Sequence, residues 1–133
     1  MGKSEGDKTE KITINLVLMD LAQIDLLVQE GFYANRTDFI RTAIRKQLAG
    51  HAEAVDQTVA RKTLVLGMQH YTRQDLEAVR AAGQTLHIRV LGLASIADDV
   101  PAELARATIE SVEVLGAFRA SAAVKAALAG RIV

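Results

Sequence analysis

The sequence of 133 residues contains no cysteine and no tryptophan, has a single proline, and is only 4% aromatic. The absence of cysteine excludes disulfides and thiolate-bound metal sites. Half of the residues are hydrophobic, so any core must be built from aliphatic side chains. The first ten residues lack the apolar core of a signal peptide, and no apolar run is long enough to span a bilayer. We therefore expect a cytoplasmic protein that does not associate with membranes.

Net charge is also absent, since sixteen basic residues balance sixteen acidic ones. Proteins that bind DNA tightly usually present a basic surface, because contacts to phosphate dominate their affinity. A DNA-binding function would therefore need positive charge that is sorted locally. Arg36, Arg41, Arg45 and Lys46 offer such a cluster, although residues like the last three more often form a solvated helix face than a phosphate contact.

Residues that could carry catalysis are few. His51, His70 and His87 are dispersed and no two of them have the spacing of metal ligands on one element. We expect imidazoles at the surface or partly buried, with His70 in a loop; a metal site shared across a dimer is the alternative. Asp98 and Asp99 precede the single proline, where helix capping explains them better than an acid–base pair. With no phosphate loop and no nucleophile elbow, we expect neither an enzyme nor a cofactor.

The segment 11–16 alternates polar and apolar residues, which predicts a short β-strand. One face carries Ile12, Ile14 and Leu16, and the other carries Lys11, Thr13 and Asn15. The strand has no partner nearby in the sequence, and an isolated strand leaves its backbone groups unpaired. A second copy of the chain could supply that partner in an antiparallel ribbon. A two-stranded ribbon fits the major groove of DNA.

A first amphipathic helix is expected next. Asp20 is a candidate N-cap, with Gln23 three residues later as in a capping box. Gly31 is placed to end the helix in a left-handed conformation. Its apolar stripe consists of Leu21, Ile24, Leu27 and Val28.

A second helix is expected to begin at Asn35 and to end at Gly50. Asn35 is a favourable N-cap, and the carboxylate of Asp38 in the first turn complements the helix dipole. The inner face of this helix consists of Phe39, Ile40, Ala43, Ile44 and Leu48.

This order of strand, helix, glycine turn and helix resembles the ribbon-helix-helix family of bacterial repressors and antitoxins, of the CopG, Arc and MetJ types. The residues that carry the resemblance are those of 11–16, the stretch 31–37 (GFYANRT), and Phe39-Ile40-Arg41 with Ala43-Ile44. The resemblance covers about a third of the chain. It implies an intertwined homodimer that binds double-stranded DNA.

The resemblance also implies roles for individual residues. Lys11, Thr13 and Asn15 would contact bases. Asn35, Arg36 and Thr37, at the start of the second helix, would contact phosphate, which agrees with the general affinity of helix N-termini for anions. The dimer core would contain Ile12, Ile14, Leu16, Ile24, Leu27, Phe39, Ile40 and Ile44. A plain dimerisation unit without DNA contact stays an alternative.

The second half of the sequence repeats. Val-Leu-Gly occurs at 65–67, 90–92 and 114–116, and Val79, Leu104 and Leu128 each lie fourteen residues after the valine. Each unit reads as strand, loop and helix, with caps at Thr72 with Asp75, at Asp99 and at Ser121. We expect Gly83 and Gly130 to close the first and third helices. A period of this length with one strand per unit is typical of a leucine-rich-repeat-like solenoid.

We therefore expect an α+β protein with an N-terminal ribbon-helix-helix and a small three-unit βα solenoid. The expected parts are a flexible N-terminal arm (1–10), a dimerisation and DNA-binding domain (11–50), a helical linker (51–61) and the βα-repeat domain (62–133). The repeats would serve higher oligomerisation or bind a protein partner. The function indicated is that of a transcriptional regulator, most simply a repressor. The alternatives are an antitoxin, whose family members usually have a disordered polar tail, and a self-assembling scaffold that does not bind DNA.

Overall fold

The computed structural model describes residues 9–133, so most of the predicted N-terminal arm, residues 1–8, lies outside the described residues. Contacts divide the chain into two compact units, with a boundary between residues 58 and 59. The helices and the three-stranded parallel sheet confirm the α+β class. In the part of the chain that the structure describes, no helix combines the length and the apolar character that a membrane crossing requires.

The unit formed by residues 10–58 is helical. It contains α1 (Leu18–Gln29), α2 (Arg36–Gly50) and most of α3 (Ala52–Lys62). The helical linker expected over 51–61 therefore coincides closely with α3. The segment before α1, residues 9–17, belongs to no helix or strand in the single chain. A ribbon needs a second strand, so the β-strand expected over 11–16 stays a prediction about the paired chains.

The sequence predicts the C-terminal end of α1 correctly but not its N-terminal end. Val17 is the N-cap and provides no side-chain hydrogen bond, so the expectation that Asp20 caps the helix is wrong. Asp20 instead lies in the first turn, where its charge still complements the helix dipole. The C-terminal end is as expected: Gly31 has φ of +86°. The N–H of Gly31 donates to the carbonyl of Val28 and that of Phe32 to Leu27, which is a Schellman motif.

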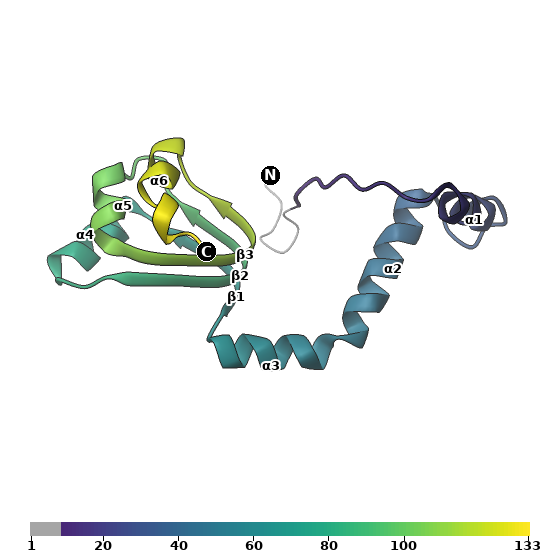
Figure 1. Ribbon diagram of the computed structural model, residues 1–133, viewed down its shortest axis with the longest axis horizontal. Helices are drawn as coiled ribbons and strands as arrows, with labels where there is room; N and C mark the ends of the chain where they lie inside the picture. Colours follow the sequence, from purple (N-terminus) through teal and green to yellow (C-terminus); the bar gives the residue numbers. More distant parts are fainter. Residues whose placement is uncertain (1–8) are drawn as a thin grey trace. The chain divides into compact units, whose positions relative to one another are not determined.

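The unit formed by residues 59–133 is built around β1 (Val65–Tyr71), β2 (Leu86–Ile96) and β3 (Ile109–Arg119). The strands are parallel and lie in the order β1-β2-β3. The helices α4 (Arg73–Ala81), α5 (Ala102–Thr108) and α6 (Ala122–Ala127) alternate with them, and a short 3-10 helix, Ala129–Arg131, follows. Figure 1 shows the three helices beside the strands and in the same order.

The three Val-Leu-Gly triplets lie side by side in the sheet. Val65 pairs with Val90 and Val90 with Val114, and the leucines and glycines follow in the same register. The core lies between one face of this sheet and the helices, because alternate strand residues and helix residues share it. Its fully buried members include Leu76, Ile88, Val90, Ala105, Ile109, Val112, Val124 and Leu128.

Glycine is required in the third position of the triplets. Gly67, Gly92 and Gly116 have φ of +117°, +141° and +120°, which L side chains rarely adopt. A Cβ on Gly92 would lie 2.1 Å from the carbonyl oxygen of Gly67, and one on Gly116 would lie 2.0 Å from that of Gly92. β2 and β3 therefore each fit against the previous strand only because their glycines have no side chain.

Three local expectations about this unit are wrong. Pro101 is the N-cap of α5 and there is no side-chain cap, so Asp99 does not cap that helix. Gly130 lies within the 3-10 helix rather than closing α6, which already ends at Ala127. His70 is part of β1 and not of a loop, because β1 extends farther beyond its glycine than the triplet alone suggests.

The capping box of α4 provides a test of local stability. The hydroxyl of Thr72 accepts a hydrogen bond from the N–H of Asp75 (3.1 Å), and the Asp75 carboxylate accepts one from the N–H of Thr72 (2.9 Å). We expect Thr72→Ala to lower the free energy of unfolding by about 1 kcal/mol, because a backbone donor loses its partner. Urea unfolding followed by circular dichroism measures this. Thr72→Ser keeps the acceptor and should stay within a few tenths of a kcal/mol of the unmodified chain.

Candidate nucleic-acid interface

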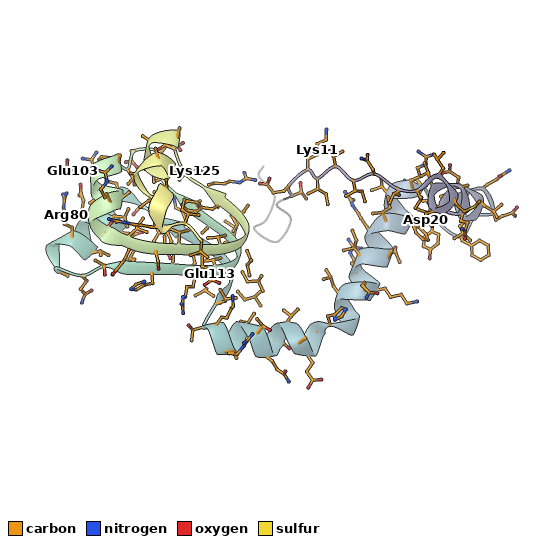
Figure 2. All side chains as sticks on the ribbon, in the orientation of Figure 1. Lys11, Asp20, Arg80, Glu103, Glu113 and Lys125 are labelled. Atoms are coloured by element: carbon orange, nitrogen blue, oxygen red, sulfur yellow. The ribbon has the colours of Figure 1, made fainter. Side chains whose placement is uncertain are left out.

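The segment before α1 presents both faces to solvent in the single chain. Ile12 is 74% exposed and Ile14 is 56% exposed. In a strand whose apolar and polar residues alternate, the apolar face is usually the buried one. The proposed base-contacting residues Lys11, Thr13 and Asn15 are exposed as well. Figure 2 shows the Lys11 side chain extending away from the backbone of the segment. The segment therefore offers a polar row and an apolar row, neither of which its own chain covers.

The apolar row continues into a groove that its own chain leaves open. The groove has a volume of about 430 Å³. It is formed by the segment before α1 together with α1 and α2, and it is lined by Ile14, Leu16, Asp20, Gln23, Ile24, Leu27, Phe39, Ile40, Ala43 and Ile44. Of the eight residues predicted to form a dimer core, seven line this groove and only Ile12 does not.

Burial within this unit is slight. Among residues 10–58, Ile24 is the only buried side chain. Leu27, Phe39 and Ile40 are half-buried, and Tyr33 packs edge-to-face on Phe39 with ring centroids 4.9 Å apart. A unit of this size needs more buried apolar surface to be stable by itself.

The start of α2 is organised by local hydrogen bonds. The side chain of Asn35 accepts from the N–H of Asp38 (2.8 Å), which confirms Asn35 as the N-cap, and the Asp38 carboxylate accepts from the N–H of Ala34 (2.9 Å). The side-chain oxygen of Asn35 is thus engaged by its own helix. Because the first N–H groups of a helix have no partner within it, the backbone of Arg36 and Thr37 remains the natural contact for an anion.

Arg36 has a partner that the sequence analysis missed. Its guanidinium forms two hydrogen bonds with the carboxylate of Asp25 on α1, Nε to Oδ1 and Nη2 to Oδ2, both 2.7 Å. This hydrogen bonding holds the pKa of the Asp25 carboxyl below its ordinary value. The pair therefore stays ionised at neutral pH and fastens the start of α2 to α1. A bidentate pair restrains the guanidinium to one plane. The carboxylate of Asp25 therefore competes with DNA phosphate for the side chain of Arg36.

The remaining basic residues of α2 are Arg41, Arg45 and Lys46, and all three are exposed. Arg41 and Arg45 are four residues apart and so lie on the same face of the helix. The sequence could have indicated the Asp25–Arg36 pair only through its opposite charges on either side of a glycine turn. Such a signal is weak because many surface charges have comparable spacing.

The histidines of the second unit have polar partners in neighbouring strands. Nδ1 of His70 lies 2.7 Å from the hydroxyl of Ser95, and Nδ1 of His87 lies 2.8 Å from that of Ser111. Within residues 9–133, no three histidine or carboxylate side chains are placed to hold a metal ion together. These imidazoles act as cross-strand hydrogen-bonding groups in the sheet.

Comparison with known protein families matches residues 7–125 to the ribbon-helix-helix transcriptional regulator family. No curated protein and no solved structure matches the chain. The family match extends over both units, well beyond the stretches between residues 11 and 44 that carry the resemblance in the sequence. Members of this family are transcriptional regulators that bind DNA and typically form dimers. With most of its length matched, the chain belongs to the ribbon-helix-helix transcriptional regulator family.

Proposed function

We propose that this protein is a homodimeric, sequence-specific DNA-binding repressor that works in the cytoplasm. The observation that carries the proposal is the open apolar groove of residues 10–58, together with the single buried side chain of that unit. Burial of one aliphatic side chain contributes about 1.5–3 kcal/mol. A second copy that covered Ile12, Ile14 and Leu16 would supply the core that one chain lacks.

Pairing of the two segments would at the same time create a reading surface. In an antiparallel ribbon the side chains alternate between the two faces, so burial of the isoleucines would turn Lys11, Thr13 and Asn15 outward. Lysine can donate to the edge of guanine, and the amide of asparagine can form two hydrogen bonds with adenine in the major groove. The alternation in the sequence thus couples dimerisation to base recognition.

Phosphate contacts would come from the start of α2. The N–H groups of Arg36 and Thr37 and the hydroxyl of Thr37 would bind the DNA backbone and set the position of the ribbon in the groove. In this proposal, dimerisation and DNA binding belong to residues 11–50, and oligomerisation or partner binding belongs to residues 62–133. The second unit supports this division, since it has its own packed core.

Base reading can be tested with Asn15→Ala. A cognate sequence is first recovered by selection from random double-stranded DNA with the purified full chain. We then expect the variant to lose about 1–3 kcal/mol of binding free energy on that sequence, because one bidentate base contact is removed. On unrelated DNA the affinity should change little. Fluorescence anisotropy with labelled duplexes measures both values.

The control for this experiment is Gln57→Ala, which removes an exposed amide from α3 and should leave both affinities unchanged. An equal loss for Asn15→Ala on cognate and unrelated DNA would contradict base reading. Failure of the selection to enrich any sequence would contradict sequence-specific binding altogether.

A further inference from the structure

The two edges of the sheet differ in whether other residues of the chain cover them. Beside β3, the C-terminal residues form a short parallel bridge between Val112 and Ile132. The N–H of Val133 also donates to the carbonyl of Val112 (2.9 Å). Beside β1, no strand of the described chain is present, because β1 ends the order β1-β2-β3. One edge is thus partly covered by its own chain, and the other is left with unpaired backbone groups.

The uncovered edge lacks the features that normally prevent strands from pairing. Edge strands of monomeric proteins commonly carry charged residues or proline. The residues of β1, VLGMQHY, contain neither Lys, Arg, Asp, Glu nor Pro. Val65 and Leu66 are 43% and 71% exposed. A strand of this composition that is left uncovered would be a site of uncontrolled association unless it has a regular partner.

Gly67 shows where another backbone could approach. On Gly92 and Gly116 the direction of the missing Cβ is filled by the carbonyl oxygen of the preceding strand. Gly67 has the same left-handed conformation, with φ of +117°, but nothing lies within 4 Å of the equivalent position. Beside Gly67, the position that the carbonyl of a parallel neighbour fills at Gly92 and Gly116 is therefore open to the backbone of another strand.

We propose that the outer edge of β1 pairs with β1 of a second copy of this chain, which joins two three-stranded sheets into one. Pairing of identical edges about a two-fold axis is necessarily antiparallel and joins only two sheets. The partly covered β3 edge favours this arrangement over head-to-tail growth. The uncharged edge favours an uncharged partner such as β1 itself. The inference specifies how residues 62–133 would oligomerise, and it rests on the proposed function in that respect alone.

The test uses the full chain with the ribbon disabled, so that only the sheet can hold two copies together. In an Ile14→Lys background we expect light scattering after gel filtration to give twice the mass of one chain. Addition of Leu66→Lys and Met68→Lys should reduce this mass to that of one chain, because charges on an edge strand oppose pairing. A mass of one chain for Ile14→Lys alone, across a dilution series, would overturn the proposal.

The matched control places the same charges in the same rows of the sheet but on the opposite edge. Leu115 pairs in register with Leu91 beside Leu66, and Ala117 with Leu93 beside Met68. Leu115→Lys with Ala117→Lys should leave the doubled mass unchanged. If this control also yields single chains, the contact involves β3 or the face of the sheet, and β1 pairing is overturned. Thermal melting monitored by circular dichroism checks that each variant stays folded.

A second measurement needs no substitution. Hydrogen–deuterium exchange of the unmodified chain should show amides of 65–71 whose exchange slows as the protein concentration rises. Exchange that is independent of concentration at these amides, while that of 11–16 slows, would overturn β1 pairing but leave the ribbon dimer in place. The reverse pattern would support β1 pairing and contradict the proposed ribbon, so the two failures are distinguishable.

Discussion

Gly92→Ala is expected to unfold most of the unit formed by residues 59–133. The added Cβ would lie 2.1 Å from the carbonyl oxygen of Gly67, and φ of +141° is itself unfavourable for alanine. Backbone strain and overpacking each cost about 1–3 kcal/mol, so we expect a loss of about 2–6 kcal/mol. At about 0.05–0.15 kcal/mol per residue, a unit of this size has a stability of about 4–11 kcal/mol, so the upper part of the expected loss is enough to unfold it. Loss of cooperative thermal unfolding in calorimetry would show it.

Gly67→Ala is the matched control for this prediction. It has a similar left-handed conformation, but its Cβ would meet nothing within 4 Å. In the single chain, with the β1 edge unpaired, we therefore expect the conformational cost alone, about 1–3 kcal/mol, and a native-like melting transition at lower temperature. Equal effects of the two variants would mean that the close approach between strands does not limit the packing of the sheet.

Ile14→Lys is expected to separate the ribbon dimer and abolish sequence-specific DNA binding. Ile14 lines the open groove and is 56% exposed in the single chain, so the substitution should cost little in one chain. In the dimer the side chain would be buried in both copies, at about 1.5–3 kcal/mol each. The dimer should therefore weaken by about 3–6 kcal/mol, or about 10²–10⁴-fold in dissociation constant. Fluorescence anisotropy on the selected sequence provides the measurement.

Thr13→Lys is the control, because it places the same charge on the neighbouring residue of the opposite row. It should leave the ribbon dimer intact, and its added positive charge should strengthen binding to unrelated DNA. If Thr13→Lys disrupts the dimer as strongly as Ile14→Lys does, the two rows do not have the separate roles proposed for them.

Features that depend on residues a few positions apart could be predicted from the sequence. Asn35, Thr72 and Ser121 cap α2, α4 and α6, because a cap is a contact between residues three apart. The parallel arrangement of the three strands follows from the repeated triplet, since equal spacing brings equal residues into register. The expectation that Asp20 caps α1 is wrong because the helix begins before it, with the apolar residues Leu18 and Met19.

Features that depend on distant residues were harder to predict. The pairing of Asp25 with Arg36 depends on how closely α1 and α2 pack, which no local pattern specifies. The steric requirement at Gly92 appears only when Gly67 lies beside it in the sheet. The strand over 11–16 is a different case, because its expected partner is another molecule and a single chain provides nothing for it to pair with.

The Asp25–Arg36 pair has a consequence for how the affinity for DNA depends on ionic strength. Each cation that neutralises a phosphate releases counterions and steepens the fall in affinity as salt is added. A guanidinium that is already neutralised by Asp25 through two 2.7 Å hydrogen bonds contributes little to this release. A regulator that contacts phosphate mainly through uncharged backbone N–H groups would thus hold its operator over a wider range of ionic strength.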